Sequence, residues 1–124
     1  MKEQFCDYET SRKLKELGFN APCIALHGEG GFNCGMIKNS KNSNWQNPVC
    51  TAPLWQQVRQ WIWDNHKAFI RLEFDDDGYY VPSLISEDGN LNFVLNNKKV
   101  HDYIEAENDA IKDAVEWLHK NIEK

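Results

Sequence analysis

The sequence predicts an α+β fold, with an antiparallel sheet of about four to five strands and two long helices packed on one face. Two stretches, near 53–65 and 102–122, repeat apolar residues with the 3.6-residue period of an amphipathic helix. Between them, shorter stretches alternate apolar and polar residues with the period of a strand. The predicted order is α-β-β-α-β-β-β-α. It lacks the strand and helix alternation of a parallel doubly wound sheet, so antiparallel pairing is favoured.

The composition fits a single domain, residues 1–124. The chain is 41% hydrophobic and has five Trp, six Phe and four Tyr, which is enough for a packed core. Its net charge of −5 makes nucleic acid an unfavoured partner. Residues 1–13 lack the apolar run of a secretion signal, and no later run reaches the roughly 18–20 residues of a membrane span. We therefore expect a cytoplasmic protein with no membrane partner.

The first element is a short helix. Asp7 or Thr10 can cap its first turn, and Leu14 and Leu17 give it one apolar side. Gly18 then supplies a left-handed stop, after which the next residue folds back.

A hairpin follows. Residues 23–27 have the length of a strand, the glycine-rich run 28–31 interrupts it, and a second strand covers 32–37. Residues 38–47 are dense in Asn, Ser and Lys without periodicity, so they predict a mobile loop.

The second helix has a clear start signal. Thr51 can cap free amides, and Pro53 suits the first turn, where no amide donor is missed. One face collects the residues that we expect to be buried: Leu54, Trp55, Val58, Trp61, Ile62 and Asn65.

Three strands of a meander come next. Residues 68–74 and 79–85 alternate, and Asp77-Gly78 between them suits a tight hairpin turn. A further turn signal precedes a third strand over 91–95.

The last helix is predicted to begin at Asp102, with Glu105 three residues later as in a capping box. Its apolar face is predicted to comprise Ile104, Ile111, Val115, Leu118 and Ile122.

Three stretches resemble a group of small uncharacterised proteins encoded by Bacteroidetes and by their phages and mobile elements. They read DYET…LKELGF…PC, CTAPLWQQVRQWIWDNH and YIEAENDAIKDAVEWLHK. The resemblance covers nearly the whole chain and implies an intracellular bacterial or phage setting and an α+β fold. It brings no catalytic or ligand residue.

The cysteines and histidines give a weak metal signal. Cys23 and His27 would share a face of a strand, and Cys34 and Cys50 could join them, yet no C-x-x-C pair is present. Small buried thiols are the commoner explanation. Residues 75–77 are three Asp, but they lack the late Glu of a calcium loop and fit a charged hairpin tip better. We expect no metal and no cofactor.

The run HGEGGFNCG suggests a ligand pocket, or a hydrolase in which His27 assists a Cys34 nucleophile beside Glu29. A phosphate loop is disfavoured, because a strand rather than a helix follows and Glu29 repels anions.

The tryptophans give the strongest hint of a binding surface. Trp63 and Trp117 fall off the apolar stripes of their helices, and Trp45 lies in the predicted loop. Alternatively, a small domain that surrounds these helices on more than one side would bury them.

The hypothesis that follows is a non-enzymatic binding or interaction module, acting on a protein partner or by self-association. The alternatives are the ligand-binding or hydrolytic pocket above and a weak binder of single-stranded nucleic acid. The last would combine Trp45 with four lysines, Lys38, Lys41, Lys98 and Lys99.

Overall fold

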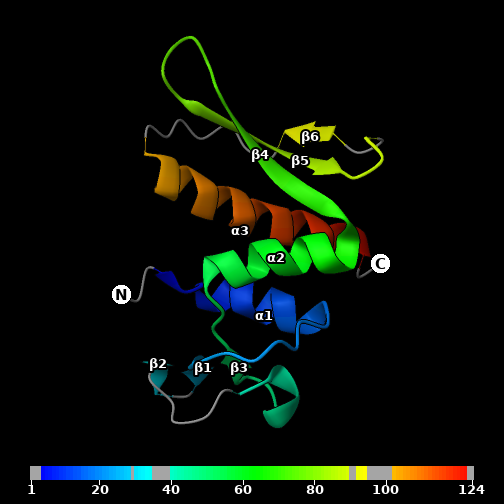
Figure 1. The fold of residues 1–124 in the computed structure, drawn as a ribbon. Helices are drawn as coiled ribbons and strands as arrows, with labels where there is room; N and C mark the ends of the chain where they lie inside the picture. The colour runs from blue at the N-terminus through cyan, green and yellow to red at the C-terminus, as the bar shows by residue number, and fades with distance from the viewer. Residues whose placement is uncertain (1–3, 29, 35–39, 90–91, 95–101, 123–124) are drawn as a thin grey trace. The chain divides into compact units, whose positions relative to one another are not determined.

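A computed structural model of the chain describes residues 4–28, 30–34, 40–89, 92–94 and 102–122. These residues form two compact units, Met1–Gln57 with Val115–Lys124, and Val58–Ala114. We call them unit 1 and unit 2 and describe each by itself. The elements are three α-helices and two antiparallel sheets of three strands (Figure 1). The predicted α+β class with antiparallel pairing is therefore confirmed.

In unit 1 the first helix, α1, covers Tyr8–Glu16 and follows its local signals. The Asp7 carboxylate accepts a hydrogen bond from the Thr10 amide at 2.9 Å, which makes Asp7 the cap. Gly18 has φ +96°, and the Phe19 amide donates back to the Leu14 carbonyl at 2.9 Å. Leu14 and Phe19 are both buried, so this helix end is part of the core of unit 1.

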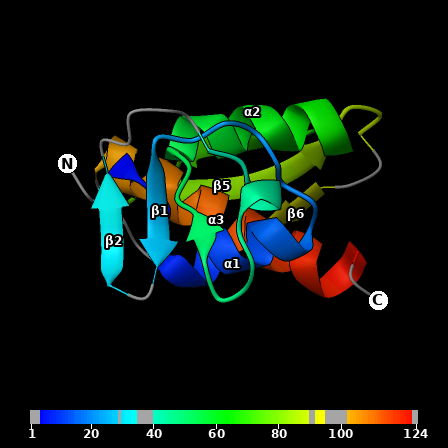
Figure 2. The same cartoon turned by 90° about the horizontal axis from the view of Figure 1, so that it is seen from below.

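The sheet of unit 1 has the strand order β2-β1-β3, and Figure 2 shows the three strands side by side. β1 covers Ala25–Gly28 and β2 covers Gly31–Cys34, which confirms the predicted hairpin at its described residues. The end of the predicted second strand, 35–37, lies outside the described residues. β3 is the two-residue strand Cys50–Thr51, which the sequence did not predict.

The prediction of one sheet of four to five strands is wrong. Both edges of β1 are already paired within unit 1, with β2 on one side and β3 on the other. Leu26 lies opposite Thr51 and His27 lies opposite Cys50. The strands after α2 therefore form a sheet of their own in unit 2.

Part of the predicted mobile loop is held in place. Asn42–Asn44 form a turn of 3-10 helix, and Asn42 is buried. Its side-chain amide donates to the Phe19 carbonyl, and its side-chain oxygen accepts from the Thr51 amide, both at 2.8 Å. One Asn of this Asn-rich segment therefore holds the segment to the core by hydrogen bonds.

Helix α2 covers Trp55–His66 and begins later than predicted. Thr51 lies in β3 and does not cap it; instead the Gln57 side chain accepts from the Leu54 amide at 3.0 Å. Of the predicted apolar face, Val58 and Ile62 are fully buried, whereas Asn65 is exposed.

The sheet of unit 2 has the order β4-β5-β6, from Ala68–Phe74, Tyr80–Ser86 and Asn92–Val94. The third strand of the meander is thus confirmed at its described residues, while 91 and 95 lie outside them. The β4–β5 turn is a five-residue loop, in which Gly78 has φ +86° and the Asp75 carboxylate accepts from the amides of Asp77 and Tyr79. The predicted tight turn is confirmed at Gly78, which adopts the positive φ that such a turn needs; the sequence did not predict the part of Asp75, whose carboxylate helps to close the turn.

Helix α3 covers Tyr103–Ile122, and Asp102 caps it by accepting from the Glu105 amide at 2.9 Å. Ile111, Val115 and Leu118 are buried as predicted, but Ile104 is 67% exposed. The side chain of Ile122 lies outside the described residues.

In Figures 1 and 2 the parts of α2 and α3 that belong to unit 2 lie on one side of its sheet. An ion pair between Arg59 and Glu107 joins these two helices at 2.8 Å. In the described part of the chain, no helix combines the length and apolar character that crossing a membrane requires.

Candidate functional site

His27 lies in β1 and is buried in unit 1. Its Nε2 lies 2.8 Å from the Cys6 carbonyl oxygen, and its ring contacts Tyr8 edge-on at 5.9 Å between centroids. A carbonyl only accepts, so Nε2 carries the hydrogen in this arrangement. That nitrogen is occupied as a structural donor and is not available as a general base.

Cys34 and His27 belong to different rungs of the hairpin. Cys34 lies opposite Ala25, whereas His27 lies opposite Phe32. The Cys34 side chain packs against an apolar cluster that includes Phe5. The two residues thus lie on neighbouring strands. In the part of the chain that the structure describes, no direct hydrogen bond joins their side chains. Glu29, the third member of the predicted pocket, lies outside the described residues.

The other three cysteines are buried in unit 1. Burial, with smaller contributions from Asp7 and Cys23, raises the pKa of Cys6 well above its usual value, and burial also raises the pKa of Cys23. The pKa of Cys50 is raised to about 11 by burial. These groups stay protonated at neutral pH, whereas nucleophiles and metal ligands need thiolates. Within the residues described, no three His, Cys, Asp or Glu side chains are grouped to hold a metal ion.

A hollow of about 410 Å³ opens beside the β1–β2 hairpin, and we call it the hairpin hollow. Its lining includes the hairpin glycines Gly28, Gly30 and Gly31, together with Asn33 and Trp45. His27 and Cys34, which the sequence suggested for a pocket in this region, do not line it. Trp45 does, and it is 39% exposed.

The other two tryptophans suggested for a binding surface, Trp63 and Trp117, are half-buried. Trp63 belongs to unit 2, where its ring meets Phe69 edge-on at 6.4 Å and the Lys67 ammonium lies 5.5 Å from its centroid. Trp117 belongs to unit 1 with Trp45, and its carbonyl accepts from the Asn121 side chain at 2.7 Å.

A set of three aromatic residues in unit 2, two of them exposed, was not predicted from the sequence. Phe74 ends β4 and is 64% exposed, and its ring lies 4.8 Å from that of Tyr80 across the ladder. Tyr80 in turn meets Tyr103 edge-on at 5.6 Å, and Tyr103 is 49% exposed. We call Phe74, Tyr80 and Tyr103 the aromatic cluster. The available signal was position: Phe74 continues the alternating face of Ala68 and Ile70 but stands at the open end of β4, beside an acidic turn, and Tyr103 follows a helix cap.

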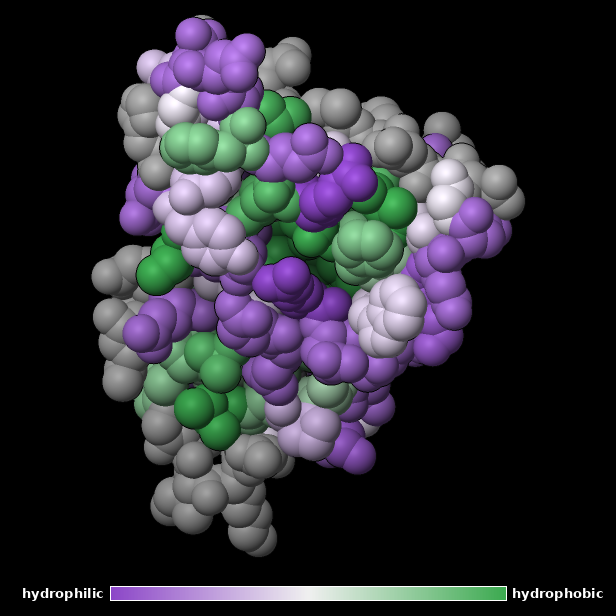
Figure 3. All heavy atoms as spheres, turned by 45° about the horizontal axis from the view of Figure 1, so that its top comes forward, coloured by the Kyte–Doolittle hydropathy of each residue, from purple (hydrophilic) through white to green (hydrophobic). Residues whose placement is uncertain are grey.

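Acidic side chains dominate the chain around this cluster. The segment 71–105 carries eight acidic and three basic side chains. Asp76 and Asp77 are exposed at the hairpin tip, and Asp102 is exposed at the start of α3. Because the Asp75 carboxylate closes the turn through two backbone amides, it has a structural role there. In Figure 3, apolar surface over the β4–β5 sheet is bordered by hydrophilic side chains.

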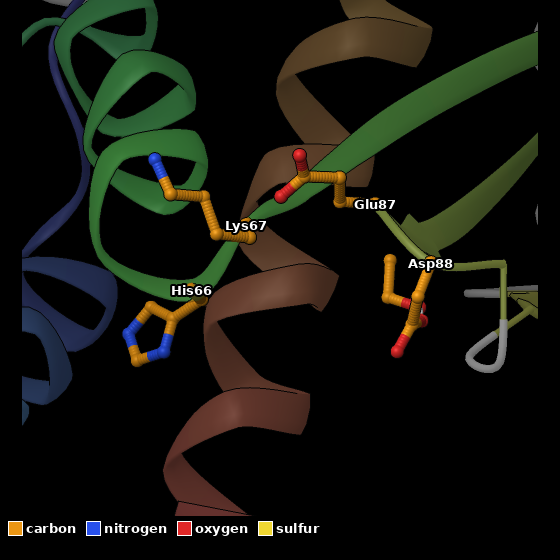
Figure 4. Close-up of a pocket in the computed structure, with 5 residues that line it drawn as sticks. His66, Lys67, Glu87 and Asp88 are labelled. Carbon is orange, nitrogen blue, oxygen red and sulfur yellow. Dashed lines mark hydrogen bonds between the residues drawn. The ribbon is translucent and has the colours of Figure 1, made fainter.

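A second hollow of about 440 Å³ in unit 2 lies between the end of α2 and the end of β5, and it is lined by His66, Lys67, Ser86, Glu87 and Asp88. His66 lines it; burial lowers its pKa, and its Nε2 is buried without a hydrogen-bond partner in the described structure. In Figure 4 the His66 imidazole and the carboxylates of Glu87 and Asp88 do not converge on one point. The Ser86 hydroxyl donates a hydrogen bond to the Asp88 carboxylate at 2.6 Å.

No protein-family model, curated protein or solved structure matches this chain. Of the lysines suggested for nucleic acid, Lys41 is exposed, whereas Lys38, Lys98 and Lys99 lie outside the described residues.

Proposed function

We propose that this chain is a small non-enzymatic interaction module that binds a protein partner through the aromatic cluster. The observation that carries the proposal is the connected set of rings Phe74, Tyr80 and Tyr103, of which Phe74 and Tyr103 are largely exposed. Large exposed apolar side chains that touch one another mark recognition surfaces more often than isolated ones do.

The rings are held in relation to one another by two elements. Phe74 and Tyr80 face each other across the β4–β5 ladder, and Tyr103 comes from the first turn of α3. These ring contacts, tilted between Phe74 and Tyr80 and edge-to-face between Tyr80 and Tyr103, restrict ring orientation before a partner arrives, which lowers the entropy that binding costs. Aromatic residues are also the commonest centres of binding energy in protein interfaces.

The charge of the chain around the cluster supports a basic partner. The excess of acidic side chains over 71–105 favours a segment that presents Lys or Arg next to an apolar residue. The aliphatic stem and charged end of such a residue suit an aromatic face bordered by carboxylates. Self-association through this cluster would bring two acidic surfaces together, so a basic protein partner is favoured over a second copy.

The region first suspected of catalysis supports the same proposal. His27 donates to the Cys6 carbonyl, and the buried cysteines have raised pKa values. Among the described residues, no hydrogen bond joins a nucleophile to a base in that region.

The test is a selection of random decapeptides on the immobilised full-length protein. We expect the selected peptides to be enriched in Lys or Arg together with an apolar residue. The change Phe74→Ser should weaken their binding at least about tenfold, because one central aromatic residue often contributes more than 1.4 kcal/mol to an interface. Phe69→Ser is the matched control, since Phe69 is an exposed Phe of the same strand outside the cluster.

Three results would contradict the proposal. Selected peptides could be acidic, Phe74→Ser could bind as well as the wild type, or no peptide could bind above background. A concentration-dependent dimer that Phe74→Ser abolishes would indicate self-association instead.

A further inference from the structure

We infer that the hairpin hollow of unit 1 is a binding site for a small, uncharged, planar heteroaromatic molecule of nucleoside size. This goes beyond the proposed protein interaction, because it concerns other residues in the other unit. The hollow measures about 410 Å³, within the range of roughly 300–1,000 Å³ that small-molecule sites occupy.

Gly28 and Gly30 line the hollow with backbone that carries no side chain. A Cβ added at Gly28 or at Gly30 would meet no atom within 4 Å, and neither residue adopts a left-handed φ. Gly31 differs, since its φ of +97° accounts for the glycine. Glycine without a side chain lets a ligand approach the backbone closely. The bare backbone at Gly28 and Gly30 therefore forms the approach surface of the hollow.

Trp45 supplies an aromatic wall, and the chain around it is held in place. The Lys15 ammonium donates to the Trp45 carbonyl at 2.9 Å and to the Val49 carbonyl at 2.7 Å. Asn42 fixes the same segment from within the core. An indole that is 39% exposed on such an anchored backbone can stack on a flat ring at little cost in entropy.

The side chains that line the hollow indicate the class of ligand. None of the described residues that line the hollow carries a charge, and the sequence places an acidic residue, Glu29, between Gly28 and Gly30, so a phosphate or carboxylate is disfavoured. Leu26 and Val49 add apolar contact, and the exposed amide of Asn33 offers both a donor and an acceptor. A neutral ring system with hydrogen-bonding edges fits this combination.

The experiment titrates the full-length protein, labelled with ¹⁵N, with the four ribonucleosides, nicotinamide and riboflavin, followed by NMR. We expect at least one probe to give saturable shifts at backbone amides of residues 26–33 and 45–49. Trp45→Ala should weaken that binding about tenfold through loss of stacking. Gly30→Ala should weaken it by a similar factor through the added methyl group, while the thermal midpoint stays the same or rises.

The matched control is Ile24→Ala, an exposed apolar residue just before β1 that does not line the hollow, and its binding should equal that of the wild type. Nucleoside 5′-monophosphates and a short single strand should bind no better than the nucleosides. Tighter binding of either would overturn the assignment to an uncharged ligand. The site itself would be overturned if no probe gives saturable shifts at millimolar concentration, or if Gly30→Ala leaves binding unchanged.

Discussion

The two units use similar residues in opposite ways. Phe5 and Phe19 of unit 1 are buried, whereas Phe69 and Phe74 of unit 2 are 40% and 64% exposed. Val58–Ala114 carries twelve acidic and six basic side chains, whereas the rest of the chain carries seven acidic and eight basic ones. Neither the aromatic content nor the net charge of the whole chain therefore describes either unit. The acidic excess and the two exposed Phe residues, Phe69 and Phe74, belong to the same 57 residues.

The largest expected effect tests the difference between buried and exposed Phe. Phe19→Ala should lower the free energy of unfolding by about 3–5 kcal/mol, because it empties a site that is 1% exposed. Phe74→Ala should lower it by less than about 1 kcal/mol, since only a surface pair with Tyr80 is lost. Urea unfolding of both variants checks this. Similar losses in the two variants would remove the contrast between the units.

A smaller effect is expected at the anchor of the Asn-rich segment in unit 1. Asn42→Ala leaves the Phe19 carbonyl and the Thr51 amide without their buried partner and should lower the free energy of unfolding by about 2–3 kcal/mol. Ser43→Ala is the control, because Ser43 is exposed and should change stability by less than about 0.5 kcal/mol. Equal stability of the two variants would show that this segment is not anchored.

The smallest effect concerns His66 in unit 2. Its folded pKa is lowered, so the unfolded chain takes up the proton more readily. The contribution of His66 to the free energy of unfolding should therefore be fully present above the ordinary His pKa of about 6.5. It should be lost as pH falls through the folded pKa, by at most about 1.4 kcal/mol per pH unit. His66→Gln should remove this part of the pH dependence in urea unfolding between pH 5 and 7. Identical profiles for wild type and variant would contradict it.

Local signals in the sequence predict the ends of elements well. Asp7, Gly18 and Asp102 act as predicted, because caps and left-handed stops depend on a few neighbouring residues. Pairing of strands depends on distant residues and was not predicted. Thr51 looks like a helix cap in its local context, yet it pairs with Leu26 and closes the edge of β1.

The candidate site was predicted less well, for a related reason. Ile104 continues the helical period of α3, but a period shows only which residues share a face and not how far other elements cover that face. Trp45 was singled out from composition, and the hollow that it lines depends on the hairpin glycines and on Lys15, thirty residues earlier. The Phe74 to Tyr80 contact required the register of the β4–β5 ladder.

The most direct test of the central claim is an NMR map of where a selected basic peptide binds on the ¹⁵N-labelled protein. The account predicts that the shifts centre on the amides of Phe74, Tyr80 and Tyr103, weaken with added salt and are lost in Phe74→Ser but not in Phe69→Ser. Shifts centred on unit 1, or shifts that persist unchanged in Phe74→Ser, would contradict it.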